Sequence, residues 1–419
     1  MNPDSSFPER LARRSAGPNS TVVRVAGPEE LLAYIPYRLG FEPVESVVVV
    51  SLSGPRQRVG LVARVDLDDL QPHRPGNPDR PDGAVTARWL AEHVVADGAD
   101  RVVVVLYTAT DTTVPSGAAR RAVDALRARL ERQLPGTEVW LVTPTGFRAL
   151  DCADPMCCPA GGRPLSMLKG SRVAAYMVLE GRTVAGTREE RYALRAAPEA
   201  ARTRARRAAA RWTGAYRRLL DAPAGSPGAL GQWGAESLDL WRSAVRAASC
   251  APPGEPFSLS PVDLGKIGAA LADLPVRDAV LLSLVAGTEE TAMRTARREV
   301  DGDTDKATGT VMARIVDPER GVPPDDGATR AAREVLEAVV AHVPRNRRAP
   351  AYLLLGLVAW WNGDGGLAAE RVSDALGVDP GYRLALLLRA AIAGGVPPGW
   401  VRRERAAFRD GPEAEAAAG

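Results

Sequence analysis

The sequence predicts an α/β domain followed by an all-helical domain. Residues 46–51, 101–107 and 137–142 are short, mostly apolar segments without alternation, which is typical of strands buried on both faces of a sheet. Stretches with helical spacing alternate with them, and this order favours a mixed, mostly parallel sheet with covering helices. Beyond Thr187 the apolar spacing is helical throughout, which predicts a second, all-α domain.

The length of the chain also favours two domains. It has 419 residues, and single hydrophobic cores stop growing beyond about 250–300 residues. We expect a disordered arm over residues 1–20, the α/β domain over 21–186, the helical domain over 187–400 and a disordered tail over 401–419.

The first helix of the α/β domain is expected to run from Pro28 to Leu39. Proline suits the first turn of a helix, and Gly40 suits the cap that ends one. Pro43 forbids any continuation. Pro36 falls inside this helix and predicts a kink or an early end.

The other elements of this half follow from the same patterns. A turn at residues 53–55 makes 59–65 the expected hairpin partner of the first buried strand. Residues 84–96 and 117–134 have helical spacing. The apolar residues 172–179 are interpreted as the last strand of the sheet.

In the C-terminal half, helices are expected over residues 189–220, 261–275, 277–285, 328–342, 351–361, 367–376 and 380–393. Residues 301–327 have the composition of a polar loop insertion. Residues 355–388 have about the length of one tetratricopeptide-type helical hairpin, with small residues such as Gly356 and Ala368 where two helices would approach. Since only one copy is found, a single tetratricopeptide-like hairpin within a compact helical domain is favoured over a repeat array.

Composition narrows the classes of function. The net charge is only +3, which argues against a chain that coats nucleic acid or an anionic membrane along its whole length. No stretch reaches the roughly 18 consecutive apolar residues that span a bilayer, and the first residues lack the apolar core of a secretory signal. With four cysteines, too few to staple a chain this long, we expect a reducing, cytoplasmic location.

Cys152, Cys157 and Cys158 form the most unusual cluster of reactive side chains in the sequence. Thiolates bind zinc, although this spacing is not that of a common zinc ribbon and a fourth thiolate would have to come from Cys250. A redox exchange between Cys152 and one of the adjacent pair is a second interpretation, since adjacent cysteines form only a strained disulfide. Structural thiols are the third.

Other candidates are weaker. Asp66 follows an expected strand and Tyr107 ends another, so both could border a ligand cleft at the carboxyl ends of strands, or could simply be turn and edge residues. Ten arginines lie between residues 188 and 218, but glutamates offset some of them, and Trp212 and Tyr216 fit a core as well as a stacking surface. No residue is therefore assigned to nucleic-acid binding.

Familiar catalytic motifs are absent. The sequence contains no P-loop, dinucleotide-binding, nucleophile-elbow or metalloprotease motif. The series Asp301, Asp303 and Asp305 begins like a calcium loop, but Lys306 stands where a glycine is required. The three histidines, His73, His93 and His342, are scattered along the sequence.

Several motifs form one ordered set along the chain. The set comprises Leu31-Leu32-Ala33-x-x-Pro36-x-x-Leu39-Gly40-Phe41-x-Pro43-x-x-Ser46-Val47, Arg64-Val65-Asp66, Cys152-x4-Cys157-Cys158-Pro159-x-x-Gly162, Arg277-Asp278-Ala279 and Ala359-Trp360-x-x-Gly363-Asp364-Gly365. This set resembles an uncharacterised actinobacterial family catalogued as domain of unknown function 4192. The resemblance spans roughly residues 20–400. It implies an actinobacterial source and one contiguous family unit, and it brings no known activity, cofactor or catalytic residue.

Two functional hypotheses follow. The first is a cytosolic, non-enzymatic interaction or regulatory protein, whose partner is another protein and whose α/β half could hold a small ligand. The second is a thiol-dependent redox or metal-binding enzyme that uses the cluster of Cys152, Cys157 and Cys158, with zinc as the candidate metal. Membranes are not expected as partners, and nucleic acid ranks below protein.

Overall fold

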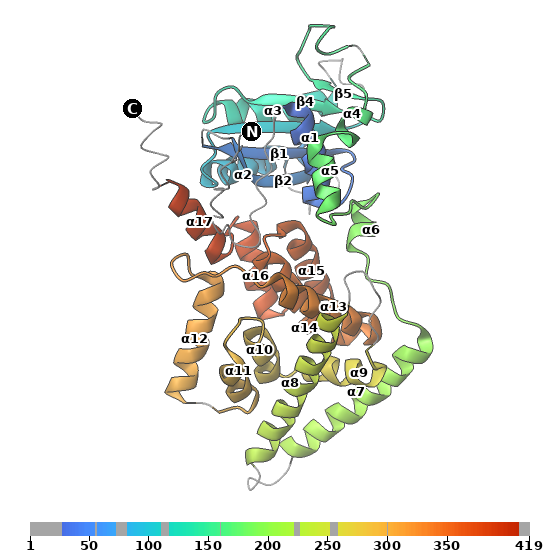
Figure 1. Ribbon diagram of the computed structural model, residues 1–419, viewed down its shortest axis with the longest axis vertical. Coiled ribbons are helices and arrows are strands. Elements are labelled where there is room, and N and C mark those ends of the chain that lie inside the picture. The colour runs from blue at the N-terminus through green and yellow to red at the C-terminus, as the bar shows by residue number, and fades with distance from the viewer. Residues whose placement is uncertain are drawn as a thin grey trace, which may run out of the picture. The chain divides into compact units, whose positions relative to one another are not determined.

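The computed structural model of the chain describes residues 27–54, 57–72, 82–109, 117–159, 161–221, 227–251, 259–299 and 301–409. The expected arm over residues 1–20 lies outside these ranges, as does His73. The chain divides into two compact units, Val23–Ala193 and Leu194–Ala406, which we name the α/β unit and the helical unit (Figure 1). The predicted order of a mixed sheet with helices followed by a helical region is confirmed.

The α/β unit is built on one sheet with the strand order β2-β1-β3-β4-β5. Its strands are β1 (Ser46–Ser53), β2 (Arg58–Asp66), β3 (Arg101–Tyr107), β4 (Glu138–Val142) and β5 (Phe147–Ala149). Its helices are α1 (Pro28–Leu39), α2 (Gly83–Ala96), α3 (Ala118–Glu131), α4 (Ser166–Lys169), α5 (Arg172–Leu179) and α6 (Arg188–Tyr192), with a short 3-10 helix, η1 (Leu67–Leu70).

The sheet is mixed as predicted, but the expectation that it is mostly parallel is wrong. Among the described strands, only β3 and β4 pair in parallel, whereas β1–β2, β1–β3 and β4–β5 are antiparallel. The reason is the short connection between β1 and β2, which pair antiparallel, followed by a crossover through α2 that places β3 on the other side of β1. Strands β2 and β3 thus run in the same direction, but β1 lies between them and runs the opposite way.

The valines of β1 and β3 fill both faces of the sheet, as their lack of alternation predicts. Val47 and Val49 pack with α2 and α3 on one face, while Val48 and Val50 pack with α1 on the other. All four are fully buried. Burial of each valine side chain contributes roughly 1.5–3 kcal/mol, so the two central strands form the stable centre of this unit.

Helix α1 has the predicted bounds, and Pro36 does not end it. The helix stops at Gly40, whose φ of 80° is left-handed and whose N–H donates to the Pro36 carbonyl oxygen. Only three residues follow Pro36 before this cap. A proline so near the end of the helix disturbs little of the backbone hydrogen bonding.

The interpretation of residues 172–179 as a strand is wrong, because they form helix α5. Ser171 caps this helix by accepting a hydrogen bond from the Ala174 N–H. Val173, Ala174 and Met177 are buried on one face of it, and α5 packs against α1. A short apolar run does not distinguish a buried helix from a buried strand, and here the preceding serine favours the helix.

The helical unit contains the remaining helices. They are α7 (Glu199–Leu220), α8 (Pro227–Cys250), α9 (Pro261–Ala270), α10 (Leu274–Leu282), α11 (Glu289–Ala296), α12 (Gly302–Val316), α13 (Asp326–His342), α14 (Ala349–Trp361), α15 (Gly365–Val378), α16 (Arg383–Ala393) and α17 (Gly399–Arg409), with the 3-10 helix η2 (Arg345–Arg347). Among the described residues, none of the helices of the chain combines the length and apolar character needed to cross a membrane.

Two expectations for this unit need correction. Residues 302–316, which were expected to lie in a polar loop, form α12, since Asp301 caps the helix by accepting from the N–H groups of Asp303 and Thr304. The start of the expected tail from residue 401 lies within α17. The polar composition of α12 reflects an exposed helix surface, because only Thr304, Val311 and Ile315 of this helix are buried.

Candidate thiol site

The three clustered cysteines lie in a loop that begins directly after β5 and is closed by the backbone. Phe147 and Arg163 form a two-way bridge, in which the Phe147 N–H donates to the Arg163 carbonyl at 2.8 Å and the Arg163 N–H donates back at 2.7 Å. Gly162 precedes this bridge with a φ of +77°, and a Cβ atom there would lie 2.9 Å from the Phe147 nitrogen. The position requires glycine for both reasons.

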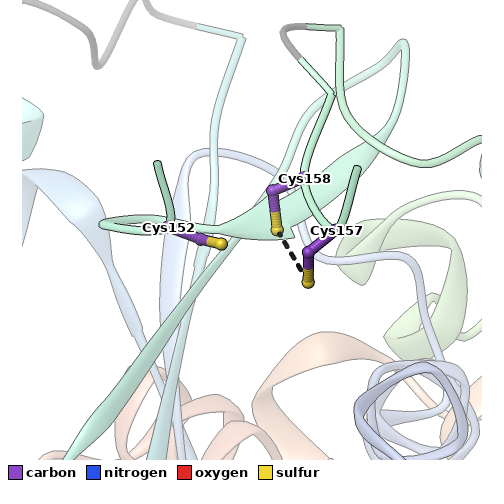
Figure 2. A group of neighbouring side chains, drawn as sticks. All are labelled: Cys152, Cys157 and Cys158. Carbon is purple, nitrogen blue, oxygen red and sulfur yellow. Dashed lines mark hydrogen bonds between the residues drawn. The ribbon is translucent and has the colours of Figure 1, made fainter. Parts of the chain in front are cut away.

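The loop brings the sulfurs of Cys152, Cys157 and Cys158 within 4.8 Å of one another. The Sγ atoms of Cys157 and Cys158 are 3.9 Å apart, and Figure 2 shows the Cys152 sulfur turned toward this pair. All three thiols are free, with Cys158 buried and the other two half-buried. The cluster that was suspected from the spacing in the sequence is thus a cluster in space.

The surroundings of Cys152 and Cys158 shift the pKa values of the two thiols in opposite directions. The pKa of the Cys152 thiol is lowered, mainly by a hydrogen bond from the backbone of Asp154 and also by one with Cys158. The pKa of the Cys158 thiol is raised, mainly by burial, against a backbone hydrogen bond at Ala149 that lowers it. Cys152 is therefore the group that first becomes a thiolate as the pH rises.

Arg163 is a member of this site that the sequence analysis missed. Its Nη2 atom donates to the Cys157 sulfur at 3.4 Å, and its Nε atom donates to the Cys157 carbonyl oxygen at 2.8 Å. No spacing rule identifies this residue, because its place beside Cys157 depends on its pairing with Phe147.

A hollow of about 280 Å³ opens beside Cys152. Its lining residues are Arg127, Glu131, Gly136, Thr137, Glu138, Val139, Trp140, Ala149, Asp151 and Cys152. Asp151, next to the cysteine in sequence, is held by ion pairs to Arg120 and Arg127 of α3. These ion pairs fix the start of the thiol loop against the helix.

Asp66 and Tyr107 lie in register on either side of Ser46, at the same end of the sheet. Asp66 is half-exposed and forms an ion pair with Arg64 at 2.6 Å. Tyr107 is buried, and its hydroxyl has no hydrogen-bond partner within the described part of the chain. Both residues therefore flank the same strand, β1, but neither lines the hollow beside Cys152.

The other candidate ligands lie elsewhere. The Nδ1 atoms of His93 and His342 each contact a backbone carbonyl oxygen at 2.7 Å, at Trp89 and Ala338 respectively. Cys250 is exposed at the C-terminal end of α8 in the helical unit. Neither histidine nor Cys250 belongs to the thiol group among the described residues.

The described residues thus combine a five-stranded mixed sheet with covering helices, a helical unit and a cluster of three free thiols. The family model described as Domain of unknown function (DUF4192) matches residues 28–316 and 325–399. The chain belongs to this family, as the resemblance in its motifs indicated. Comparisons with the curated proteins and with the solved structures find no match.

Proposed function

We propose that the protein is a regulatory protein whose α/β unit binds Zn²⁺ through the thiolates of Cys152, Cys157 and Cys158. The observation that carries this proposal is the convergence of three sulfurs within 4.8 Å. A Zn–S bond of about 2.3 Å in tetrahedral geometry places two ligand sulfurs about 3.8 Å apart. The Cys157–Cys158 separation of 3.9 Å fits this value.

The surroundings of the sulfurs suit a thiolate centre. Three thiolates around Zn²⁺ carry a net charge of −1, and the guanidinium of Arg163 beside Cys157 offsets it. A backbone hydrogen bond at Asp154 lowers the pKa of the Cys152 thiol, and one at Ala149 opposes the larger raising of the Cys158 pKa by burial, so both bonds favour thiolates. Zinc binding releases the thiol protons, so affinity is expected to fall as the pH falls.

Three protein ligands leave a fourth tetrahedral position for water or another ligand. Structural zinc sites usually have four protein ligands, whereas sites with three keep an open position. Cys152 and Cys157 are half-buried, which supports access from solvent. A metal with an open coordination position exchanges more readily than one with four protein ligands. Zinc bound here would therefore regulate the loop between β5 and Arg163 rather than serve as a permanent structural ion.

The test is metal content together with cobalt spectroscopy on the full chain. We expect one Zn²⁺ per chain and, after replacement by Co²⁺, a thiolate-to-cobalt charge-transfer absorption. The variants C152S, C157S and C158S should each weaken binding and reduce that absorption, whereas C250S is the matched control and should do neither. Absence of metal binding under reducing conditions, or equal loss with C250S, would refute the proposal.

A redox function is the second candidate, favoured by the opposite pKa shifts of Cys152 and Cys158. The Cys152 thiolate would attack a peroxide and become a sulfenic acid, with release of the other peroxide oxygen as water. The Cys158 thiol would then attack this sulfur, which forms a disulfide and releases a second water. Peptide mapping after peroxide treatment should show a disulfide between Cys152 and Cys158. Oxidation of Cys250 alone would exclude this function.

The interaction role belongs to the helical unit. Consecutive helices α14 and α15 pack together, with Gly356 so close to α15 that a Cβ atom would lie 3.0 Å from Val372. This supports our proposal of a single tetratricopeptide-like hairpin that helps to form a surface for a protein partner. The free thiols support a reducing, cytoplasmic location.

A further inference from the structure

Helix α7 carries a row of arginines without acidic partners, which we name the arginine stripe. It consists of Arg204, Arg207, Arg211 and Arg218. At 3.6 residues per turn these positions fall within a sector of about 60° on the helix surface and extend for about 21 Å along its axis. All four side chains are exposed, and within the described part of the chain none of them forms an ion pair or hydrogen bond.

A separate face of α7, centred about 115° around the helix from the stripe, is packed. Its buried residues are alanines, and α9 approaches so closely that a Cβ atom on Gly265 would lie 2.2 Å from the Ala205 carbonyl oxygen. Helix α7 forms one edge of the helical unit (Figure 1). The packing of α9 therefore fixes the arginine stripe on the outer side of this edge.

Some arginines on other helices have acidic partners one turn away. Arg330 pairs with Glu334 in α13, and Arg120 pairs with Asp124 in α3. The acidic residues near the arginine stripe do not play this role. Glu199 binds Arg202 and Arg206 instead, and Glu189 and Glu190 belong to α6 in the α/β unit.

We infer that the arginine stripe binds the phosphate backbone of a nucleic-acid duplex. Guanidinium groups form bidentate hydrogen bonds with phosphates, and four exposed, unpaired guanidiniums in one row complement a row of negative charges. The 21 Å length of the stripe corresponds to about six phosphate steps of 3.4 Å along one strand. This assignment revises the low rank of nucleic acid in the sequence analysis, because the glutamates thought to offset the arginines lie off the stripe.

The aromatic residues of α7 favour a duplex over a single strand. The Trp212 Nε1 atom donates to Ser237 at 3.1 Å, and the Tyr216 hydroxyl donates to Asp273 at 2.9 Å. Both rings pack against Trp233. The two rings are half-buried and held against this cluster, so they are not the exposed stacking platforms that single-strand binding uses.

An anionic membrane and an acidic protein are less suitable partners. Helices that bind membrane surfaces insert an apolar face, whereas the alanine face of α7 is covered by α9. A guanidinium binds a carboxylate as well as a phosphate, so the experiment below compares nucleic acid with an acidic polypeptide.

The test is fluorescence anisotropy with the full chain and labelled DNA duplex, RNA duplex, single-stranded DNA, polyglutamate and phosphatidylserine vesicles. For four phosphate contacts, the logarithm of the duplex association constant should fall against the logarithm of salt concentration with a slope of about −3.6. The variant R204Q/R207Q/R211Q/R218Q should lose this binding. The control R206Q/R217Q/R330Q/R333Q removes the same charge away from the stripe and should retain it.

Equal weakening by both quadruple variants, in chains with unchanged circular dichroism, would overturn the assignment to the stripe. Binding of polyglutamate or vesicles as tight as that of either duplex would overturn the assignment to nucleic acid. Tighter binding of the DNA or of the RNA duplex would support the proposal and identify the source of the phosphates.

Discussion

The substitution Gly162→Ala tests how the backbone closes the thiol loop. A left-handed conformation costs a non-glycine residue about 1–2 kcal/mol, and Gly162 has a φ of +77°. The added Cβ atom would also lie 2.9 Å from the Phe147 nitrogen and 3.1 Å from the Gly146 carbonyl carbon. Since both neighbours are backbone atoms, they cannot rotate away, and such overpacking costs typically about 1–3 kcal/mol.

The loop can relieve this strain by opening the Phe147–Arg163 bridge, so the effect should be local. We expect the closed loop to be destabilised relative to the open loop by at least about 1.4 kcal/mol. This value corresponds to an open population about tenfold larger and to hydrogen exchange about tenfold faster. The measurement is amide exchange at Phe147 and Arg163, followed by NMR. The affinity for zinc should fall as the loop opens, because the three sulfurs would no longer be held together.

Gly161→Ala is the matched control. A Cβ atom at Gly161 would meet nothing within 4 Å, so this variant should exchange at the parent rate. Equal protection of the two bridge amides in Gly162→Ala and in the parent would refute the reasoning that glycine is required for closure of the loop.

Three further predictions follow from side chains of the α/β unit. Tyr107→Phe should leave the unfolding free energy unchanged or raise it by about 1 kcal/mol, because it removes a buried, unpartnered hydroxyl; a loss in urea unfolding would instead show that a bound water or ligand uses this group. The Glu42 side chain is exposed, but partial desolvation raises the pKa of its carboxyl above the ordinary value, against a smaller lowering by Lys169. The folded state therefore binds a proton more tightly than the unfolded state and loses stability as the pH rises through the folded pKa. Glu42→Gln should therefore melt at a higher temperature than the parent at pH 7, with no gain below pH 4.5, and an equal gain at both pH values would contradict this cause. In metal-free protein at neutral pH, iodoacetamide should modify Cys152 before Cys158, because their pKa values shift in opposite directions; mass spectrometry that finds Cys158 modified first would show the reverse order.

The sequence predicts the elements of the α/β unit better than their directions. Runs of valine identified β1 and β3 because residues without alternation must be buried on both faces. Strand direction depends on which strands become neighbours, and the crossover through α2 made β1 rather than β2 the partner of β3. Residues 172–179 were misassigned because a short, mostly apolar run of eight residues fits either a strand or a helix.

The thiol site was predictable only in part. The spacing of Cys152, Cys157 and Cys158 pointed to one cluster because the three residues are close in sequence, and the structure brings their sulfurs together. Arg163 was missed because its contact with Cys157 arises from backbone pairing across the loop. The arginine stripe needed the structure as well, since charge balance along the sequence does not reveal which acidic residues share a helix face.

The Phe147–Arg163 bridge also protects the sheet from self-association. Unpaired strand edges invite pairing with another chain, and long apolar segments are the most hazardous. In this sheet the valine-rich β1 and β3 are interior, while one outermost strand is the three-residue β5, shielded by Arg163. The other, β2, carries arginines at positions 58 and 64, and charged side chains at such a border discourage fibril growth.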